Sequence, residues 1–179
     1  MATYKGIKGY KVQSLASDPP TAQSLGQLWY NTTSSVLKYS IEGAGTWSAG
    51  GNTNTAVDLA GYCGIQTAAM YFGGRNTVTT ATVTSETYNG TAWTETADLL
   101  TPVYNNLGFG TTTAGVSAGG APNRATTFTS NGTSWTAAND MQNSIYNTHG
   151  TGTQTAGMRA GGGPSPAQSS KTEIYDGTS

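Results

Sequence analysis

Few side chains in this sequence have the types and spacing that acid–base, nucleophilic or metal chemistry requires. The chain has one histidine, His149, and one cysteine, Cys63, so a Ser-His-Asp or Cys-His triad would have to include His149. His149 falls at the end of an expected strand. The carboxylates are scattered singly, and no histidine pair or acidic cluster has the spacing of metal ligands. We therefore predict no enzymatic activity, no catalytic residues, no metal and no cofactor.

A second group of side chains favours binding rather than catalysis. Arg75, Arg124 and Arg159 each lie close to a pair of consecutive glycines, and Tyr71 precedes the first pair. Arginine and aromatic side chains together can hold a carbohydrate or an anionic surface glycan. These four residues are the predicted ligand-binding set. The alternative is that the arginines are ordinary loop residues that keep the surface soluble.

The composition excludes several partner classes. Charged residues make up only 9% of the chain and the net charge is −1, against about 25% charged residues in an average soluble domain. No basic surface of the kind that binds nucleic acid is expected. No run of 18 apolar residues could span a membrane, and residues 1–11 lack the apolar core of a signal peptide. We expect a protein that is made without export and contacts neither nucleic acid nor membrane.

The strongest signal is an internal repeat. Gly64, Gly110 and Gly152 are 46 and 42 residues apart, and the Gly-Gly pairs and the tryptophans repeat these two spacings. Three independent landmarks with one period indicate repeated structural units. The landmarks after residue 50 are the pairs Gly73-Gly74, Gly119-Gly120 and Gly161-Gly162, with Trp93 and Trp135; Trp47 stands one period earlier.

Each unit is expected to form four short strands. Asn-Gly and Asp-Gly pairs suit turns between antiparallel strands, because they adopt positive φ at low cost. The Gly-Gly pairs mark strand ends where the backbone bends, and each tryptophan is expected to fill a gap between neighbouring units. Thr, Val and Tyr dominate between these marks, so the predicted class is all-β. In the first unit the strands are placed at 57–63, 67–72, 80–88 and 92–95.

The units are predicted at 57–102, 103–144 and 145–179, and together with the connecting residues they form a repeat domain over 50–179. A four-stranded sheet that repeats every forty-odd residues is typical of a β-propeller blade, and closed propellers have about four to eight blades. The third unit is incomplete, so these units cannot close a ring alone. Either the chain continues past Ser179 or partner chains complete the ring; the first is favoured, because the break falls inside a motif.

Two further segments precede the repeats. Residues 1–24 are predicted to be an anchoring arm, in which lysines recur every third position beside aromatic residues; its candidate contacts are Tyr4, Lys5, Lys8, Tyr10 and Lys11. The bland alternative is a solvated tail. Asp18-Pro19-Pro20 is expected to be a stiff break. Residues 25–49 are predicted to be a β-hairpin module with strands at 27–31 and 36–41.

Two resemblances add to this prediction. Gly73-Gly74, Tyr88 and Trp93 resemble the kelch motif, although the second unit departs from it with Ser130 at the tyrosine position. The low-charge, Thr/Gly-rich units are most similar to kelch-like repeats of bacteriophage structural proteins. Residues 26–47, with Gly26-x-Leu-Trp-Tyr-Asn and a later Leu-Lys-Tyr, resemble a hairpin found in phage tail-fibre and tail-associated proteins.

These resemblances imply a virion protein, located on a tail fibre or another external appendage. Its N-terminal arm would attach to other virion proteins, its repeats would contact a host surface glycan or receptor, and the fibre would be a homo-trimer. The first alternative is a purely structural protein that decorates a capsid, neck or tail. The second is a propeller enzyme that acts on polysaccharides, which the scarcity of histidines and acidic clusters disfavours.

Overall fold

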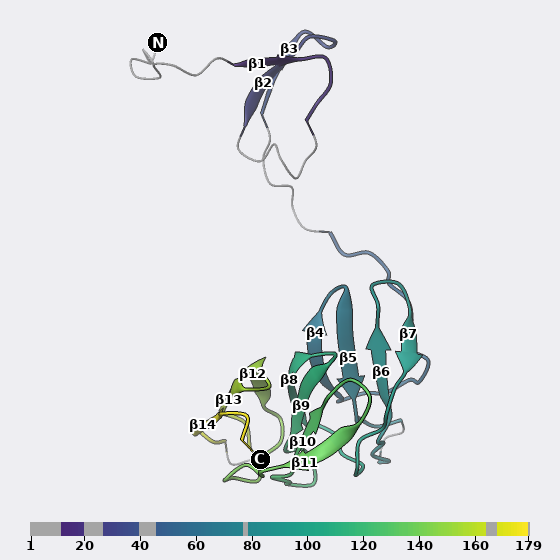
Figure 1. Cartoon of the computed structure of the whole chain (residues 1–179), viewed down its shortest axis with the longest axis vertical. Helices are drawn as coiled ribbons and strands as arrows, with labels where there is room; N and C mark the ends of the chain where they lie inside the picture. The colour runs from purple at the N-terminus through teal and green to yellow at the C-terminus, as the bar shows by residue number, and fades with distance from the viewer. Residues whose placement is uncertain (1–11, 20–26, 40–45, 77–78, 164–167, 179) are drawn as a thin grey trace. The chain divides into compact units, whose positions relative to one another are not determined.

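The structure is a computed structural model that describes residues 12–19, 27–39, 46–76, 79–163 and 168–178. The chain divides into two compact units, Met1–Ser48 and Ala49–Ser179. The described residues contain strands, turns and bends without any helix, which confirms the predicted all-β class (Figure 1). It follows that this part of the chain offers no helix of the length and apolarity needed to cross a membrane.

The N-terminal unit contains one three-stranded sheet. β2 (Leu28–Asn31) and β3 (Val36–Tyr39) form the antiparallel hairpin, and β1 (Gln13–Leu15) pairs with β2 in parallel. The hairpin strands lie within the predicted 27–31 and 36–41. Asn31 fixes the turn, because its side-chain oxygen accepts hydrogen bonds from the backbone N–H groups of Thr33 and Ser34 at 3.0 and 2.9 Å.

Asp18 ties the residues before the hairpin to the hairpin itself. Its carboxylate accepts hydrogen bonds from the Trp29 indole at 3.0 Å and the Asn31 amide at 2.7 Å, and pairs with the Lys38 ammonium at 2.7 Å. These donors lower the pKa of Asp18 to about 2. The arm predicted over residues 1–24 is therefore not separate from the hairpin, because β1 and Asp18 belong to the same folded sheet. The five predicted anchoring residues lie outside the described residues.

The second unit contains three repeat sheets, each following one sequence repeat (Figure 1). The first repeat sheet has the order β4-β5-β6-β7, the second β8-β9-β10-β11 and the third β12-β13-β14, all with antiparallel neighbours. The strands are β4 Gly61–Ile65, β5 Ala68–Phe72, β6 Ser85–Tyr88, β7 Trp93–Glu95, β8 Leu107–Thr111, β9 Ala114–Ala118, β10 Thr127–Ser130, β11 Trp135–Ala138, β12 His149–Thr153, β13 Ala156–Ala160 and β14 Thr172–Tyr175.

The first strand of the first repeat sheet starts later than predicted, at Gly61 rather than residue 57. Leu59 has a φ of 55°, a left-handed conformation that interrupts an extended strand. The third strand starts at Ser85 rather than residue 80. In that stretch Thr82 bonds to Thr84 through its hydroxyl, which offers the backbone an alternative to the sheet ladder. Local conformation at single residues therefore shortened both strands.

The repeated glycines have a geometric cause that is the same in each unit. Gly64, Gly110 and Gly152 have φ values of 99°, 99° and 113°, and a Cβ atom on any of them would lie 2.2 Å from the carbonyl oxygen four residues later. The first pair, Gly73-Gly74, also has positive φ, and the Gly74 N–H donates to the Val103 carbonyl at 2.8 Å. The pair therefore holds the loop that leads to the next sheet.

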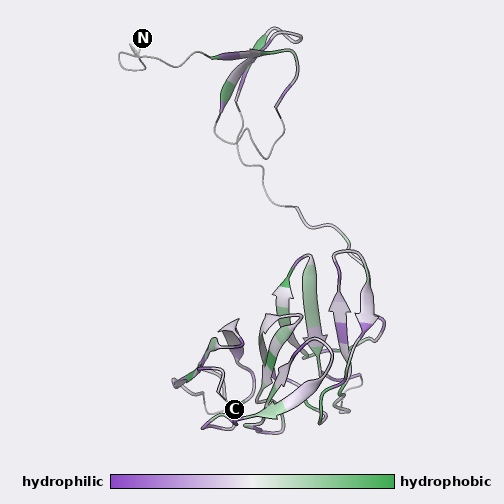
Figure 2. Cartoon of the chain, in the orientation of Figure 1, coloured by the Kyte–Doolittle hydropathy of each residue, from purple (hydrophilic) through white to green (hydrophobic). Residues whose placement is uncertain are grey.

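The core lies between consecutive repeat sheets, whose first strands β4, β8 and β12 are neighbours. One apolar cluster fills the space between the first and second sheets, and includes Met70, Phe72, Phe128 and Trp135. A second cluster lies between the second and third sheets, with Leu107, Phe109, Val116 and Ala118. Figure 2 colours β5 towards the hydrophobic end of the scale, in agreement with the two side chains that this strand contributes to the first cluster.

The two repeat tryptophans are equivalent by position, because each begins the fourth strand of its sheet, but only one of them is largely buried as expected. Trp135 is only 4% exposed, and its ring packs edge-on against Phe72 of the preceding sheet, with centroids 4.9 Å apart. Trp93 is half-buried and contacts the rings of Tyr71 and Tyr88 in its own sheet. The cause is position: no repeat sheet precedes the first one within Ala49–Ser179, so Trp93 has no Phe72 counterpart to pack against.

In the first and third sheets, a glutamate on the third strand holds the chain segment that leads into the sheet. Glu86 is fully buried and accepts hydrogen bonds from the backbone N–H groups of Asn54 and Thr55, at 2.9 and 2.8 Å. Glu173 does the same for Gln142, which stands before Gly152 at the same distance as Asn54 before Gly64. The second sheet has Phe128 at this position, and Phe128 packs in one cluster with Leu99. An apolar contact there takes the place of the carboxylate.

Candidate functional site

The single cysteine and the single histidine, which could act as a nucleophile and a base, lie on different strands, β4 and β12. Cys63 is buried on β4, and burial raises the pKa of its thiol to about 12. Its Sγ donates to the Thr111 carbonyl at 3.4 Å. A thiol in this state is a weak nucleophile, because the thiolate is the reactive form. His149 is the exposed first residue of β12. Among the described residues no group of three His, Cys, Asp or Glu side chains could hold a metal ion.

Two of the four predicted ligand-binding residues are structural. Tyr71 is completely buried, and its hydroxyl donates to Glu86 Oε1 at 2.6 Å. Arg159 is 3% exposed and forms an ion pair with Glu173 at 2.6 Å. Both lie on the second strand of their sheets at the same distance after the repeat glycine, so Arg159 and Tyr71 perform one role. Tyr71 lies on a strand, as predicted, and Arg159 lies on β13 rather than in the loop after it. Both side chains are buried rather than available to a ligand, because alternate residues of a strand point between the sheets.

The other two predicted residues do lie in loops after Gly-Gly pairs. Arg75 donates through Nε and Nη2 to the two carboxylate oxygens of Asp58, at 3.0 and 2.8 Å. Its guanidinium carbon also lies 5.1 Å from the centre of the Tyr104 ring. Arg124 donates to the Thr101 hydroxyl at 3.3 Å. Both side chains are half-buried, and their hydrogen bonds go to residues of neighbouring loops.

A hollow of about 290 Å³ is lined by Tyr104, whose ring Arg75 contacts, and by Asn105, Ala121, Pro122, Asn123 and Tyr146. We call it the tyrosine–asparagine hollow. The two tyrosines are half-buried and Asn123 is exposed. Two aromatic rings and two side-chain amides give apolar faces together with hydrogen-bond donors and acceptors. This combination suits a ligand that has both C–H faces and hydroxyl groups.

The loops that precede β8 and β12 form much of this hollow. Asn105 has a φ of 55° and Asn147 a φ of 52°, and both follow a tyrosine. Asparagine tolerates this left-handed conformation better than most residues. The Asn105 N–H donates to the Leu59 carbonyl at 2.7 Å, and the Ala121 N–H donates to the Tyr104 carbonyl at 2.7 Å. The first bond holds the loop before β8 against the residues before β4, and the second brings it against the loop after β9.

Sequence reasoning missed these residues, although a signal was present. Tyr104 and Tyr146 stand at the same distance before Gly110 and Gly152, and an asparagine follows each. Extending the repeat alignment towards the N-terminus of each unit would have found the pair. The first unit has Asp58 at this position, which is the partner of Arg75.

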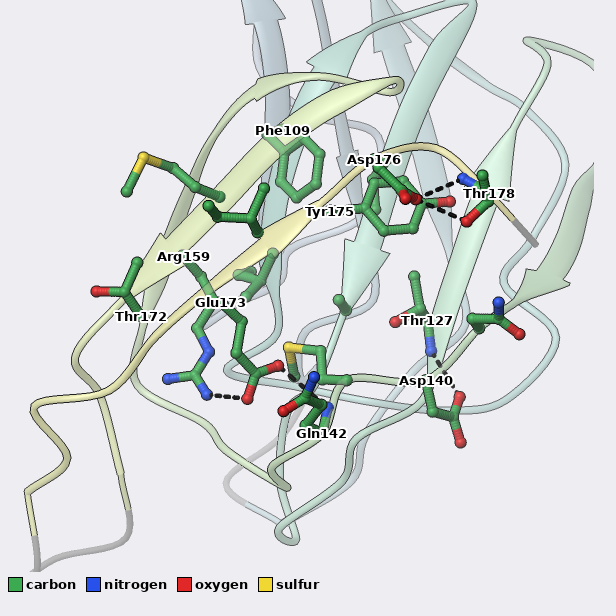
Figure 3. A pocket seen from close by; sticks show the side chains of 17 residues that line it. Phe109, Thr127, Asp140, Gln142, Arg159, Thr172, Glu173, Tyr175, Asp176 and Thr178 are labelled. Carbon is green, nitrogen blue, oxygen red and sulfur yellow. Dashed lines mark hydrogen bonds and ion pairs between the residues drawn. The ribbon is translucent and has the colours of Figure 1, made fainter.

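A second and larger cleft, of about 480 Å³, separates the second and third repeat sheets (Figure 3). Its floor includes Phe109 and Ala118, and Tyr175 packs against Phe109 with ring centroids 6.2 Å apart. Figure 3 shows the Arg159–Glu173 ion pair on one wall and the Asp176–Thr178 turn at the other end. Burial alone would raise the pKa of Glu173, but bonds from Asn143 and Arg159 outweigh it and lower that pKa.

Comparisons with known proteins give a likeness of fold alone. No family model matches the chain, and no curated protein matches it. Among the solved structures with a similar fold is one titled "Structure of YjhT", with a TM-score of 0.58 and 10% sequence identity. The match covers 82% of this chain and 47% of that chain, so the present chain spans about half of that structure.

Proposed function

We propose that the three repeat sheets are consecutive blades of an incomplete β-propeller of the kelch-like type. Three observations support this arrangement. The sheets follow one another in sequence order, their first strands are neighbours, and each interface between sheets has its own apolar cluster. Radial repetition of four-stranded antiparallel sheets is the construction of a propeller.

We further propose that the protein is a non-enzymatic component of a phage virion, on a tail fibre or other external appendage. The resemblance of residues 26–47 to the tail-associated hairpin supports this location. The N-terminal unit would attach the protein to other virion proteins, and the repeat unit would face the host. The buried Cys63, with its high thiol pKa, argues against nucleophilic catalysis at that residue.

The proposed contact with the host is a surface glycan in the tyrosine–asparagine hollow. The observation that carries this proposal is the convergence of Tyr104, Asn105, Asn123 and Tyr146 from three loops at one surface hollow. Sugar rings present C–H faces that stack on aromatic rings, and hydroxyl groups that bond to amides. Arg75 packs against the Tyr104 ring and is paired with the Asp58 carboxylate, so it supports the ring while its charge is balanced, and the proposal does not depend on a charged sugar.

A glycan array probed with the full chain tests this proposal. The double variant Tyr104→Ala/Tyr146→Ala should bind its best glycan at least about tenfold more weakly, because it removes both stacking faces. The matched control is Tyr39→Ala, which removes an exposed tyrosine from the N-terminal unit and should bind normally. If the parent chain binds no glycan, or if the double variant binds as well as the parent, the decoration role becomes the better account.

A further inference from the structure

Two Gly-Gly loops contact the segment that leads to the next sheet through the same backbone bond. The Gly74 N–H donates to the Val103 carbonyl at 2.8 Å, and the Gly120 N–H donates to the Ile145 carbonyl at 2.8 Å. We call these the first and the second loop contact. In both, the residue after the accepting one is a tyrosine that lines the tyrosine–asparagine hollow. The two contacts therefore place the residue after each Gly-Gly pair beside a tyrosine.

In the first loop contact, the residue after the Gly-Gly pair is Arg75 and the tyrosine is Tyr104. The guanidinium carbon of Arg75 lies 5.1 Å from the centre of the Tyr104 ring, within the distance at which a cation is attracted to the face of an aromatic ring. The Asp58 carboxylate holds the same guanidinium through bonds of 3.0 and 2.8 Å. The first loop contact thus shows that this position beside a tyrosine accommodates a cation.

In the second loop contact, the same position carries a much smaller side chain. Ala121 stands 46 residues after Arg75, which is the repeat spacing, and its side chain is one methyl group. Tyr146 takes the place of Tyr104, and both Ala121 and Tyr146 line the tyrosine–asparagine hollow. The hollow therefore lies where the first loop contact has the side chain of a cationic residue.

The lining of the hollow suits a cation that the ligand brings. The residue at the position of Asp58 is now Tyr104, so a second aromatic ring replaces the carboxylate, and none of the six lining residues is charged. The faces of aromatic rings carry negative charge density, and the amide oxygens of Asn105 and Asn123 are hydrogen-bond acceptors. Rings and amides of this kind stabilise an ammonium or trimethylammonium group without an ion pair.

We propose that the tyrosine–asparagine hollow binds a positively charged group of the glycan, a free amino or trimethylammonium substituent, against the Tyr146 ring. The inference rests on the glycan contact proposed above and names the chemical class of its ligand. The sign is opposite to that of the anionic glycan expected from the arginines in the sequence. Arg75 is paired with Asp58 and does not line the hollow, so it offers no free charge to an anion there.

Pairs of glycans that differ only in one amino group test this proposal with the full chain. In each pair one glycan carries a free amino group and the other carries the same group acetylated, which is neutral. Under mildly acidic conditions, where the amine is protonated, the amino form should bind about tenfold more tightly, as one cation–π contact in a half-buried site allows. The preference should disappear as the pH rises and the amine loses its proton.

Two variants of Tyr146 separate the effect of its ring from a merely structural one. Tyr146→Leu removes the aromatic face, so the ratio between the two dissociation constants of a glycan pair should fall from about ten towards one. Tyr146→Phe is the matched control, because it keeps the face and should keep the ratio. A substitution that only disturbs the loop weakens both glycans of a pair alike and leaves the ratio unchanged.

Ala121→Arg tests the position itself, because it gives the second loop contact the arginine of the first. Its guanidinium should occupy the hollow beside Tyr146 and abolish binding of both glycans, while urea unfolding shows whether the variant is folded. If it fails to fold, the ratios of the Tyr146 variants still decide.

Three outcomes overturn the inference. They are an acetylated glycan that binds as tightly as its amino form, an unchanged ratio in Tyr146→Leu, and a folded Ala121→Arg chain that binds normally. Tight binding of neutral glycans, lost in the Tyr104→Ala/Tyr146→Ala variant, would overturn this inference and leave the proposed function standing. A chain that binds no glycan of either kind overturns both.

Discussion

At the scale of single residues, the buried carboxylate of Glu86 shows how a polar residue can organise a repeat. Burial by itself would raise the pKa of Glu86, but hydrogen bonds from the Tyr71 hydroxyl and from the backbone of Asn54 and Thr55 outweigh it and lower that pKa. A carboxyl group whose pKa falls on folding stabilises the protein when ionised. The ionised Glu86 carboxylate therefore stabilises the contact between residues 54–55 and the first repeat sheet.

Replacing Glu86 with glutamine should lower the free energy of unfolding by about 2–3 kcal/mol at pH 7, because charge-assisted bonds are lost. The stabilisation by Glu86 is fully present above its unfolded pKa of about 4.3, and is lost as the pH falls through its lower folded pKa. The difference between parent and variant should therefore shrink as the pH falls below about 4. Urea unfolding at several pH values measures it. Glu95→Gln, at an exposed residue opposite Glu86 on β7, is the control and should have no such effect.

The same residues explain what the sequence predicted at this scale. Glu86 and Glu173 hold similar places in their units, which the repeat explains, and both accept hydrogen bonds from the backbone that leads into their sheets. The burial of Tyr71 and Arg159 was not visible, because a strand residue near a Gly-Gly pair can point to a loop or between sheets. Only the register of β5 and β13 with their partner strands places both side chains beside a glutamate.

At the scale of elements, the repeat period and the turn residues predicted which segments pair, and the sheets confirm it. Strand limits were predicted less well, because left-handed residues such as Leu59 and side-chain bonds such as Thr82–Thr84 are not apparent from β propensity. The tyrosine–asparagine hollow was missed for a related reason. It forms where loops from two units meet. The shared spacing of Tyr104 and Tyr146 before Gly110 and Gly152 marks them as equivalent positions, but it does not show that their loops meet at one hollow.

Alanine substitutions in the Gly-Gly pairs can separate two costs: the strain of a left-handed backbone, and the collision of a Cβ atom with a neighbouring residue. Gly119 and Gly161 have φ values of 64° and 69°, but a Cβ atom would lie 2.6 Å from the Ile145 carbonyl oxygen at Gly119 and meet nothing closer than 3.6 Å at Gly161. Gly161→Ala should cost about 1–2 kcal/mol, the penalty of the left-handed conformation alone. Gly119→Ala should cost clearly more, because the loop to the third sheet must move. Thermal or urea unfolding measures both; equal losses would show that the contact with Ile145 is unimportant.

At the scale of the whole molecule, the described residues form a small three-stranded unit and a repeat unit of three antiparallel sheets. The sequence predicted the change of character near residue 50, where the structure places the boundary between Ser48 and Ala49. It did not predict that β1 and Asp18 belong to the first unit. The parallel pairing of β1 with β2 spans a gap in sequence that no local pattern reveals.

This finding changes how the proposed attachment to the virion must be tested. A deletion of residues 1–24 would remove β1 and the Asp18 carboxylate, on which Trp29, Asn31 and Lys38 depend. Loss of the protein from particles would then report misfolding as readily as lost attachment. A deletion of residues 1–11 removes the five candidate anchoring residues and leaves that sheet complete.

We expect particles that encode the 1–11 deletion to carry much less of this protein, because the tyrosine rings and lysine stems that would bury against a partner are gone. The quantity is measured by mass spectrometry of purified particles, relative to a major particle protein. A variant with residues 1–11 replaced by a Gly/Ser segment of equal length controls for chain length and should behave like the deletion. An emission spectrum of Trp29 that matches the parent, recorded in chains whose other three tryptophans are replaced by phenylalanine, shows that the first unit is folded. Normal incorporation of either variant would place the attachment in the hairpin sheet instead of the arm.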